Sequence, residues 1–84
     1  MQHKIEITRA GFGPPIPGPV HPGDSVWFVN LEQVERNANA DNGWLETPNL
    51  QPGQSWGIWC RFPRGDIRYH DRYYTHLTGI LRLE

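Results

Sequence analysis

Apolar and polar residues alternate along much of the chain with a period of two. The alternation is visible in residues 3–8, 26–30 and 54–62, and again in two runs around a short polar loop within residues 65–84. A period of two is typical of β-strands with one buried and one exposed face. The pattern therefore predicts an all-β protein of about seven short strands.

The same alternation indicates which side of each strand faces the core. Trp27 falls on the opposite side from Phe28, and Trp59 alternates in the same way with Ile58. Both tryptophans are therefore expected to point away from the core. The expected core residues are Ile5, Ile7, Val26, Phe28, Trp56, Ile58, Tyr69, Ile80 or Leu81, and Leu83, with Cys60 and Phe62 also inward.

Proline, glycine and asparagine mark the connections between the strands. Residues 10–23 contain five of the eight prolines. Because proline donates no hydrogen bond to a sheet, this segment is expected to form a loop and an edge strand. Residues 31–40 hold the one candidate helix, but they are few and rich in asparagine, so a connection leading to a short strand near residues 36–40 is favoured. The sequence "DNG" at residues 41–43 predicts a tight turn.

Size and composition limit the architecture. The chain has 84 residues, close to the lower limit for a self-sufficient hydrophobic core, and we expect one domain over residues 1–84, taken as a monomer. The apolar fraction is 37%, and 4 Trp, 3 Tyr and 3 Phe supply much of the area that can be buried. Cys60 is the only cysteine, so an intrachain disulfide is excluded and a buried, unreactive thiol is expected.

Charge and hydropathy exclude two classes of partner. The formal net charge is −1, whereas non-specific binding of nucleic acid needs a clustered basic surface. No run of about 18 apolar residues is present, so no membrane span is expected. The first residues lack the apolar region of a secretory signal. The compartment stays open: the periplasm or the extracellular space for a mature domain, or the cytoplasm if Met1 is the native start.

Five segments together carry a resemblance to a known family. Residues 65–84 form two strands around a loop, and "VHPGDSVWFVN" (residues 20–30) and "LQPGQSW" (residues 50–56) precede them. In this order and at these spacings the segments resemble the cupredoxins, the small blue-copper proteins of the plastocyanin and amicyanin type. The resemblance implies a Greek-key β-sandwich. The other matching residues are Phe12, Pro14, the Arg36-Asn37 pair, Tyr69 and Gly79.

The resemblance also identifies the positions of the four copper ligands, where this chain has other residues. Cupredoxins use two histidines, a cysteine and usually a methionine. A thiolate and two imidazoles are what type-1 copper needs, so we predict that no blue-copper centre forms and that no cofactor is bound. The residues at the vacated ligand positions are Arg36, Asp71, Tyr74 and Leu77.

These replacements suggest what takes the place of the metal. Arg36 and Asp71 have opposite charges and would face each other across the vacated site, with the carboxylate accepting hydrogen bonds from the guanidinium. Tyr74 would donate a further hydrogen bond, and Leu77 would fill the volume of the methionine. We predict that this ion pair ties the two sheets together. The alternative is that Arg36 and Asp71 are unrelated solvated charges.

Four histidines keep a second metal hypothesis open. His76 together with Asp71 and Tyr74 would make a weak copper or zinc site of a different type. His70 alternates with Asp71 and should point away from such a site. His3 and His21 lie elsewhere and have no evident partner in the sequence.

The sequence shows no pattern of an enzyme active site, and we interpret the chain as a copper-free binding or structural module. A protein partner would contact the end that carries Arg36 and residues 71–77. Exposed aromatic residues are common at binding surfaces. A small sandwich with half-covered side chains, a sugar-binding platform of tryptophans and a domain of a larger copper-oxidase-like assembly remain alternatives. The candidate contact residues are Tyr73, His76, Trp27 and Trp59.

Overall fold

The computed structural model describes residues 1–14, 16 and 18–84 of the chain. In this part the regular elements are strands, and no helix is long and apolar enough to cross a membrane. The all-β prediction and the expected number of strands are confirmed. The strands are β1 (Gln2–Thr8), β2 (Gly11–Gly13), β3 (Ser25–Asn30), β4 (Asn39–Ala40), β5 (Ser55–Trp59), β6 (Gly65–His70) and β7 (Thr78–Leu83).

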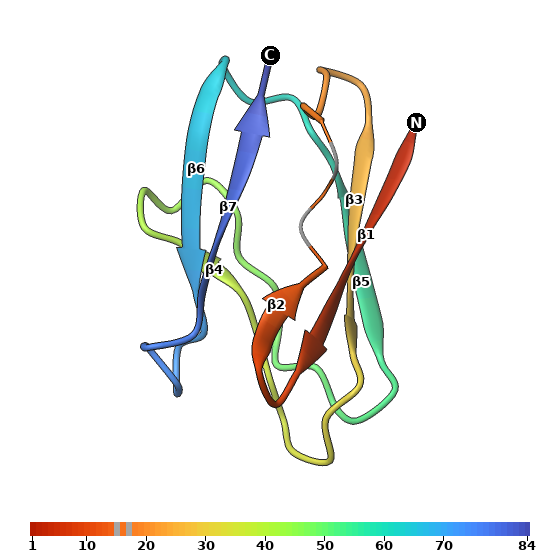
Figure 1. The fold of residues 1–84 in the computed structure, drawn as a ribbon, viewed down its shortest axis with the longest axis vertical. Coiled ribbons are helices and arrows are strands. Elements are labelled where there is room, and N and C mark those ends of the chain that lie inside the picture. Colours follow the sequence, from red (N-terminus) through yellow and green to blue (C-terminus); the bar gives the residue numbers. More distant parts are fainter. Residues whose placement is uncertain (15, 17) are drawn as a thin grey trace.

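The strands form two sheets that pack against each other (Figure 1). One sheet has the order β2-β1-β3-β5 and the other the order β4-β6-β7. β1 pairs in parallel with β3, and the remaining strand pairs are antiparallel. Because the chain crosses between the sheets after β3, after β4 and after β5, strands far apart in sequence face each other across the core.

The core lies between the sheets and contains most of the residues that the alternation predicted, whereas Trp56, Ile58 and Phe62 are only half-buried and pack against it. Phe12, Phe28 and Tyr69 meet edge to face, with ring centroids 4.9–6.4 Å apart, a geometry that aromatic rings prefer. At the position left open by the sequence, Leu81 is buried and Ile80 is exposed. Further buried apolar residues, which the sequence did not single out, are Val20, Ala38, Ala40, Leu45, Leu50 and Ile67.

Two aromatic rings lie across glycines of a neighbouring strand. Tyr69 of β6 is opposite Gly79 of β7, and a Cβ atom built at Gly79 would lie 2.3 Å from the Tyr69 ring. Trp27 of β3 covers Gly57 of β5 in the same way, and a Cβ atom there would lie 2.4 Å from the indole. Each glycine therefore provides the space in which a ring packs flat against the sheet.

The strand expected over residues 54–62 is shorter than predicted. β5 ends at Trp59, but the amide of Cys60 still donates to the carbonyl of Asp24 at 2.7 Å. Cys60 is buried, as expected, and burial together with the nearby Asp24 carboxylate raises the pKa of its thiol. A protonated, buried thiol is a poor nucleophile and a poor metal ligand.

The connection between β3 and β5 contains little regular structure. Of the strand expected near residues 36–40 only β4 forms, and Arg36 pairs instead with Leu50 through two backbone hydrogen bonds. The tight turn predicted for residues 41–43 is present, with a positive φ of 81° at Gly43. This connection brings Arg36 beside the loop between β6 and β7, where its side chain donates to Asp71.

The proline-rich segment begins with an edge strand, as predicted. β2 pairs with β1 and is 3 residues long. Further along, Val20 forms a parallel bridge with Leu83 of β7, which joins the two halves of the sandwich at the end opposite to Arg36. The part of the predicted loop that contains Pro15 and Pro17 lies outside the described residues.

Candidate functional site

Arg36 is fully buried at one end of the sandwich, and its guanidinium binds two carboxylates. Its Nε donates to Oδ2 of Asp71 at 2.5 Å, and its Nη1 donates to Oε1 of Glu32 at 2.8 Å. Nη1 also donates to the carbonyl oxygen of Thr8 at 3.0 Å. The predicted pairing of Arg36 with Asp71 is confirmed, and both side chains are fully buried. Asp71 balances the positive charge that Arg36 brings into the protein, and Glu32, whose side chain is partly exposed, adds a second negative charge beside it.

Two aromatic rings lie against the same guanidinium. Its central carbon is 5.7 Å from the centroid of Phe12 and 5.3 Å from that of Tyr74. Cations within about 6 Å of an aromatic face are attracted by the ring quadrupole. The Nη2 atom of Arg36 is buried and has no hydrogen-bond partner among the residues that the structure describes. The two rings therefore contribute to stabilising a charge that hydrogen bonds satisfy only in part.

The carboxylate of Asp71 accepts four hydrogen bonds. Oδ2 accepts from Nε of Arg36 and from the amide of Asn37 at 3.2 Å. Oδ1 accepts from the amides of Tyr73 at 2.9 Å and Tyr74 at 3.1 Å. Two carboxylate oxygens offer about four lone-pair positions, so the acceptor capacity of Asp71 is fully used by the protein.

These contacts decide the protonation state of Asp71. Burial acts to raise the pKa of its carboxyl, but the hydrogen bonds from Arg36 and from the three backbone amides outweigh burial, and the pKa is lowered. Asp71 is therefore ionised at neutral pH. Because its pKa is lower in the folded state than in the unfolded state, the ionised group stabilises the fold above the unfolded pKa of about 3.9, and this contribution is lost as the pH falls below it.

Asp71 and Asn37 also shape the loop between β6 and β7. The amide of Asp71 donates to the carbonyl of Leu77 at 3.0 Å and closes the loop. Within the loop, the amide of Leu77 donates to the carbonyl of Tyr74 at 2.8 Å. Oδ1 of Asn37, which is buried, accepts from the amide of Arg72 at 2.7 Å. Residues 36–37 of one connection thus hold residues 71–77 of another. The contact with the other sheet is made by the guanidinium of Arg36, which donates to the carbonyl of Thr8 at the end of β1.

Tyr74 and Leu77 contact this end of the molecule in ways that the sequence did not indicate. The hydrogen bond from Tyr74 to Asp71 comes from its backbone amide, not from its hydroxyl as predicted, because the ring is placed over Arg36. Leu77 is half-buried, and its side chain lies beside Gly11 at the start of β2. The ring of Tyr74, which is 39% exposed, thus lies between Arg36 and the solvent.

The four candidate contact residues belong to two different parts of the surface. Tyr73 and His76 are exposed in the loop between β6 and β7. Trp27 and Trp59 point away from the core, as predicted, but they come from β3 and β5 on the outer face of the four-stranded sheet. The exposure of Trp27 has a structural reason, since its ring covers Gly57.

Sequence reasoning missed three partners. Glu32, which binds Arg36, has an i to i+4 spacing that usually indicates a pair on a helix, and no helix forms there. His3, for which no partner was expected, is buried and lies 2.9 Å from Oδ2 of Asp24, and the ring of His21 lies 3.0 Å from the carbonyl of Glu84. The "GD" turn at residues 23–24 is the signal that could have indicated Asp24 as a partner.

The residues at this end do not fit a type-1 copper ion. The guanidinium of Arg36 is itself a cation and offers no lone pair to a metal, and Leu77 has no donor atom. The hypothesis of a weak site made by Asp71, Tyr74 and His76 needs a free lone pair on Asp71, and four hydrogen bonds already use its acceptor positions. Across the described residues, no group of three or more His, Cys, Asp and Glu side chains is placed to hold a metal ion.

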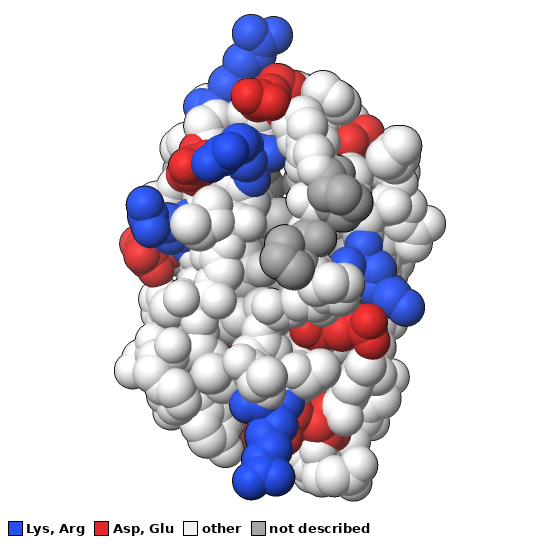
Figure 2. Space-filling model, viewed as in Figure 1, with Lys and Arg blue, Asp and Glu red and all other residues white. Residues whose placement is uncertain are grey.

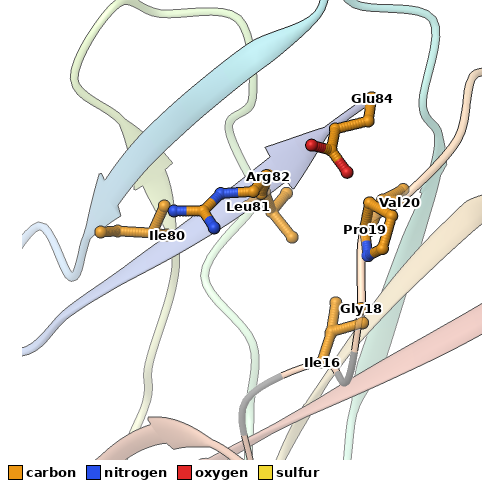
Figure 3. Close-up of a pocket in the computed structure, with 8 residues that line it drawn as sticks. All are labelled: Ile16, Gly18, Pro19, Val20, Ile80, Leu81, Arg82 and Glu84. Carbon is orange, nitrogen blue, oxygen red and sulfur yellow. The ribbon is translucent and has the colours of Figure 1, made fainter.

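An open depression of about 340 Å³ lies at the opposite end, between β7 and the segment around Val20 (Figure 3). Ile16 and Leu81 contribute apolar surface, and Arg82 and Glu84 contribute charged groups. The guanidinium of Arg82 is already paired with Asp66 at 3.1 Å. The depression therefore lacks the convergent polar groups that small-molecule sites use, and we assign it no function.

No protein-family model and no curated protein sequence matches the chain. Solved structures do match it. A novel purple cupredoxin from Nitrosopumilus maritimus has a TM-score of 0.82 and 18% sequence identity, over 98% of this chain and 99% of that one. The M98A mutant of amicyanin has a TM-score of 0.80 and 20% identity, over 98% of this chain and 81% of that one.

A copper-containing nitrite reductase from Thermus scotoductus also matches, with a TM-score of 0.86 and 20% identity. The match covers all of this chain but only 22% of the nitrite reductase. At these identities the likeness concerns the fold. The chain has the cupredoxin fold, as the sequence resemblance implied.

Proposed function

We propose that this chain is a copper-free binding module of cupredoxin fold, neither an electron carrier nor an enzyme. It binds a protein partner through the end of the sandwich formed by the connection after β3 and by the loop between β6 and β7. The single observation that carries the proposal is the buried pair of Arg36 and Asp71. It holds the place that the fold resemblance gives to the metal.

The contacts of Arg36 and Asp71 support the copper-free part of the proposal. A copper ion at this end would have to displace the guanidinium of Arg36 and remove hydrogen bonds from Asp71. Leaving one partner of a buried ion pair unpaired costs about 3–5 kcal/mol, and no thiolate is present to offset that cost. Cys60 lies beside Asp24, whereas Arg36 is held by Leu50 at the other end of β5.

Exposed apolar side chains around the ion pair support the binding part. Tyr73 is 56% exposed, and Tyr74, Leu31 and Val34 are also exposed in the loops at this end. Aromatic side chains above a rigid base are enriched at protein interfaces. Figure 2 shows acidic and basic residues lying close together on the viewed face rather than forming a basic patch, so nothing there favours nucleic acid.

The variant Tyr73→Lys tests the proposed contact surface. The affinity is measured for a protein that the wild-type chain binds. If the end that carries Tyr73 forms the contact, the dissociation constant of the variant should be at least about tenfold higher, because aromatic anchors dominate interface energetics. Ile80→Lys is the matched control, since Ile80 is 49% exposed but lies on the outer face of β7. Equal loss in both variants, or loss only with Ile80→Lys, would contradict the proposal. Circular dichroism checks that both variants are folded.

A further inference from the structure

β5 is an edge strand of the four-stranded sheet (Figure 1). The strand itself has no residue that would prevent it from pairing with another strand. Its sequence, Ser-Trp-Gly-Ile-Trp, contains no charged residue and no proline. Natural edge strands are usually protected by lysine, proline, a bulge or a covering segment, because their free amides and carbonyls pair readily. An unprotected apolar edge therefore indicates an interaction surface.

The other sheet edges are different. β2 is 3 residues long and is followed by Pro14, and β4 is 2 residues long. β7 is covered at its end by Val20. The amide of Val20 donates to the carbonyl of Arg82, and its carbonyl accepts from the amide of Glu84. Of these edges, β5 offers the longest stretch without such protection.

The hydrogen bonds to β3 show which backbone groups of β5 are free. At the two ends of the pair, Cys60 donates to Asp24 and Asn30 donates to Gln54, so the even-numbered residues face β3. In an antiparallel pair the direction alternates from residue to residue. The amides and carbonyls of Ser55, Gly57 and Trp59 therefore point away from the sheet. No backbone partner for them is found within residues 1–14, 16 and 18–84.

We propose that a second copy of this chain pairs with β5 in antiparallel orientation, with the two-fold axis at Gly57. In this register Gly57 is opposite Gly57 of the second copy, and Ser55 is opposite its Trp59. All three outward-facing positions then become hydrogen-bonded pairs, and two four-stranded sheets join into one continuous sheet.

The side chains of β5 are complementary to themselves in this register. On the outer face, Trp59 is 63% exposed and meets the small Ser55 of the second copy, which leaves room for the indole. On the inner face, Trp56 meets Ile58. Both point inward yet are only half-buried in a single chain, because nothing lies beyond the edge. Aromatic and β-branched cross-strand pairs stabilise sheets, and no charge is buried.

The small size of this contact indicates a weak dimer. Pairing five residues of each chain places the interface at the low end of the known range, below about 1,200 Å². We therefore expect a dimer that forms at high protein concentration and exchanges rapidly, in place of the monomer assumed from the sequence. This dimer is independent of the proposed function, because Tyr73 lies outside β5.

Sedimentation equilibrium over a broad concentration range tests the dimer. The wild-type chain should show reversible dimerisation, and Ser55→Pro should weaken it at least about tenfold, since each dimer loses two hydrogen bonds at once. The proline removes only an amide that the single chain does not use. Ser55→Ala is the matched control and should dimerise like the wild type, and Tyr73→Lys should do so too.

Hydrogen exchange gives a second readout that does not depend on the variants. The amides of Gly57 and Trp59 should exchange rapidly in dilute protein and at least about tenfold more slowly at high concentration. A chain that stays monomeric at the highest concentration overturns the proposal. Dimerisation that leaves the exchange of these two amides unchanged, or that Ser55→Pro does not weaken, also overturns it.

Discussion

Replacing Asp71 by alanine should lower the free energy of unfolding by about 3–5 kcal/mol, the cost of breaking one side of a fully buried ion pair. The substitution leaves the guanidinium of Arg36 buried with one carboxylate instead of two. It also leaves the amides of Tyr73 and Tyr74 without their acceptor. For so small a protein this loss is a large part of the total stability.

Urea unfolding of the wild type and of two variants measures this effect. Asp66→Ala is the matched control, because Asp66 also pairs with an arginine, but that pair is exposed to solvent, and only a small change is expected. A loss of stability in Asp71→Ala no larger than that in Asp66→Ala would show that the buried pair does not stabilise the fold.

The double variant Arg36→Leu with Asp71→Leu identifies the cause of the loss. If an unpaired buried charge is what destabilises Asp71→Ala, then removing both charges should restore most of the stability, since apolar residues often replace a buried ion pair at little cost. Stability should also fall on acidification below about pH 4, and less steeply in the double variant, because Asp71 has a lowered pKa. Losses that simply add would argue against the pair.

Replacing Gly79 by alanine should destabilise the fold by about 1–3 kcal/mol or more, the usual cost of overpacking a core. The new methyl group would lie 2.3 Å from the ring of Tyr69. That ring is buried and packed edge to face against Phe12 and Phe28, so any movement of it would disturb both aromatic contacts.

Gly57→Ala is the matched comparison for Gly79→Ala. The methyl group would lie as close to Trp27 as the other would lie to Tyr69, but Trp27 is 38% exposed and can rotate into solvent. Thermal unfolding should therefore show a smaller loss for Gly57→Ala, accompanied by a change in tryptophan fluorescence. If Gly57→Ala proved the more damaging of the two, the packing assigned to Tyr69 and Gly79 would be wrong.

The strands were predictable from the sequence because alternation is a local signal, whereas the sandwich topology was implied by the resemblance of five segments to the cupredoxins. Period-two patterns located the strands and assigned buried or exposed faces to residues such as Phe28 and Trp59, and the structure confirms both. Where two apolar residues are adjacent, as at Ile80 and Leu81, either of them could face the core, and the sequence prediction left this position open. The irregular connection between β3 and β5 has no period, so the burial of Leu45 and Leu50 was not predicted.

Only the contact that depends on charge and on aligned positions could be predicted for the site. Opposite charges at matched positions indicated that Arg36 and Asp71 pair. The role of Tyr74 depends on ring orientation, and the role of Glu32 depends on how a non-helical connection folds back. The pair of His3 with Asp24 joins β1 to the turn before β3, and these segments lie side by side only in the folded sheet. The spacing of Glu32 from Arg36 and the turn at residues 23–24 are local patterns, but neither pattern alone identifies the partner.

Calorimetric titration with Cu(II), run in parallel on the wild-type chain and on Asp71→Asn, tests the central claim of a copper-free site most directly, because carboxylate and imidazole donors suit this oxidation state. If Arg36 and Asp71 hold the place of the metal, the two proteins should give the same heats, because any copper bound elsewhere on the surface does not involve Asp71. One-to-one binding that is present in the wild type and lost in Asp71→Asn would contradict the account. It would show that the end carrying the ion pair opens to accept a metal.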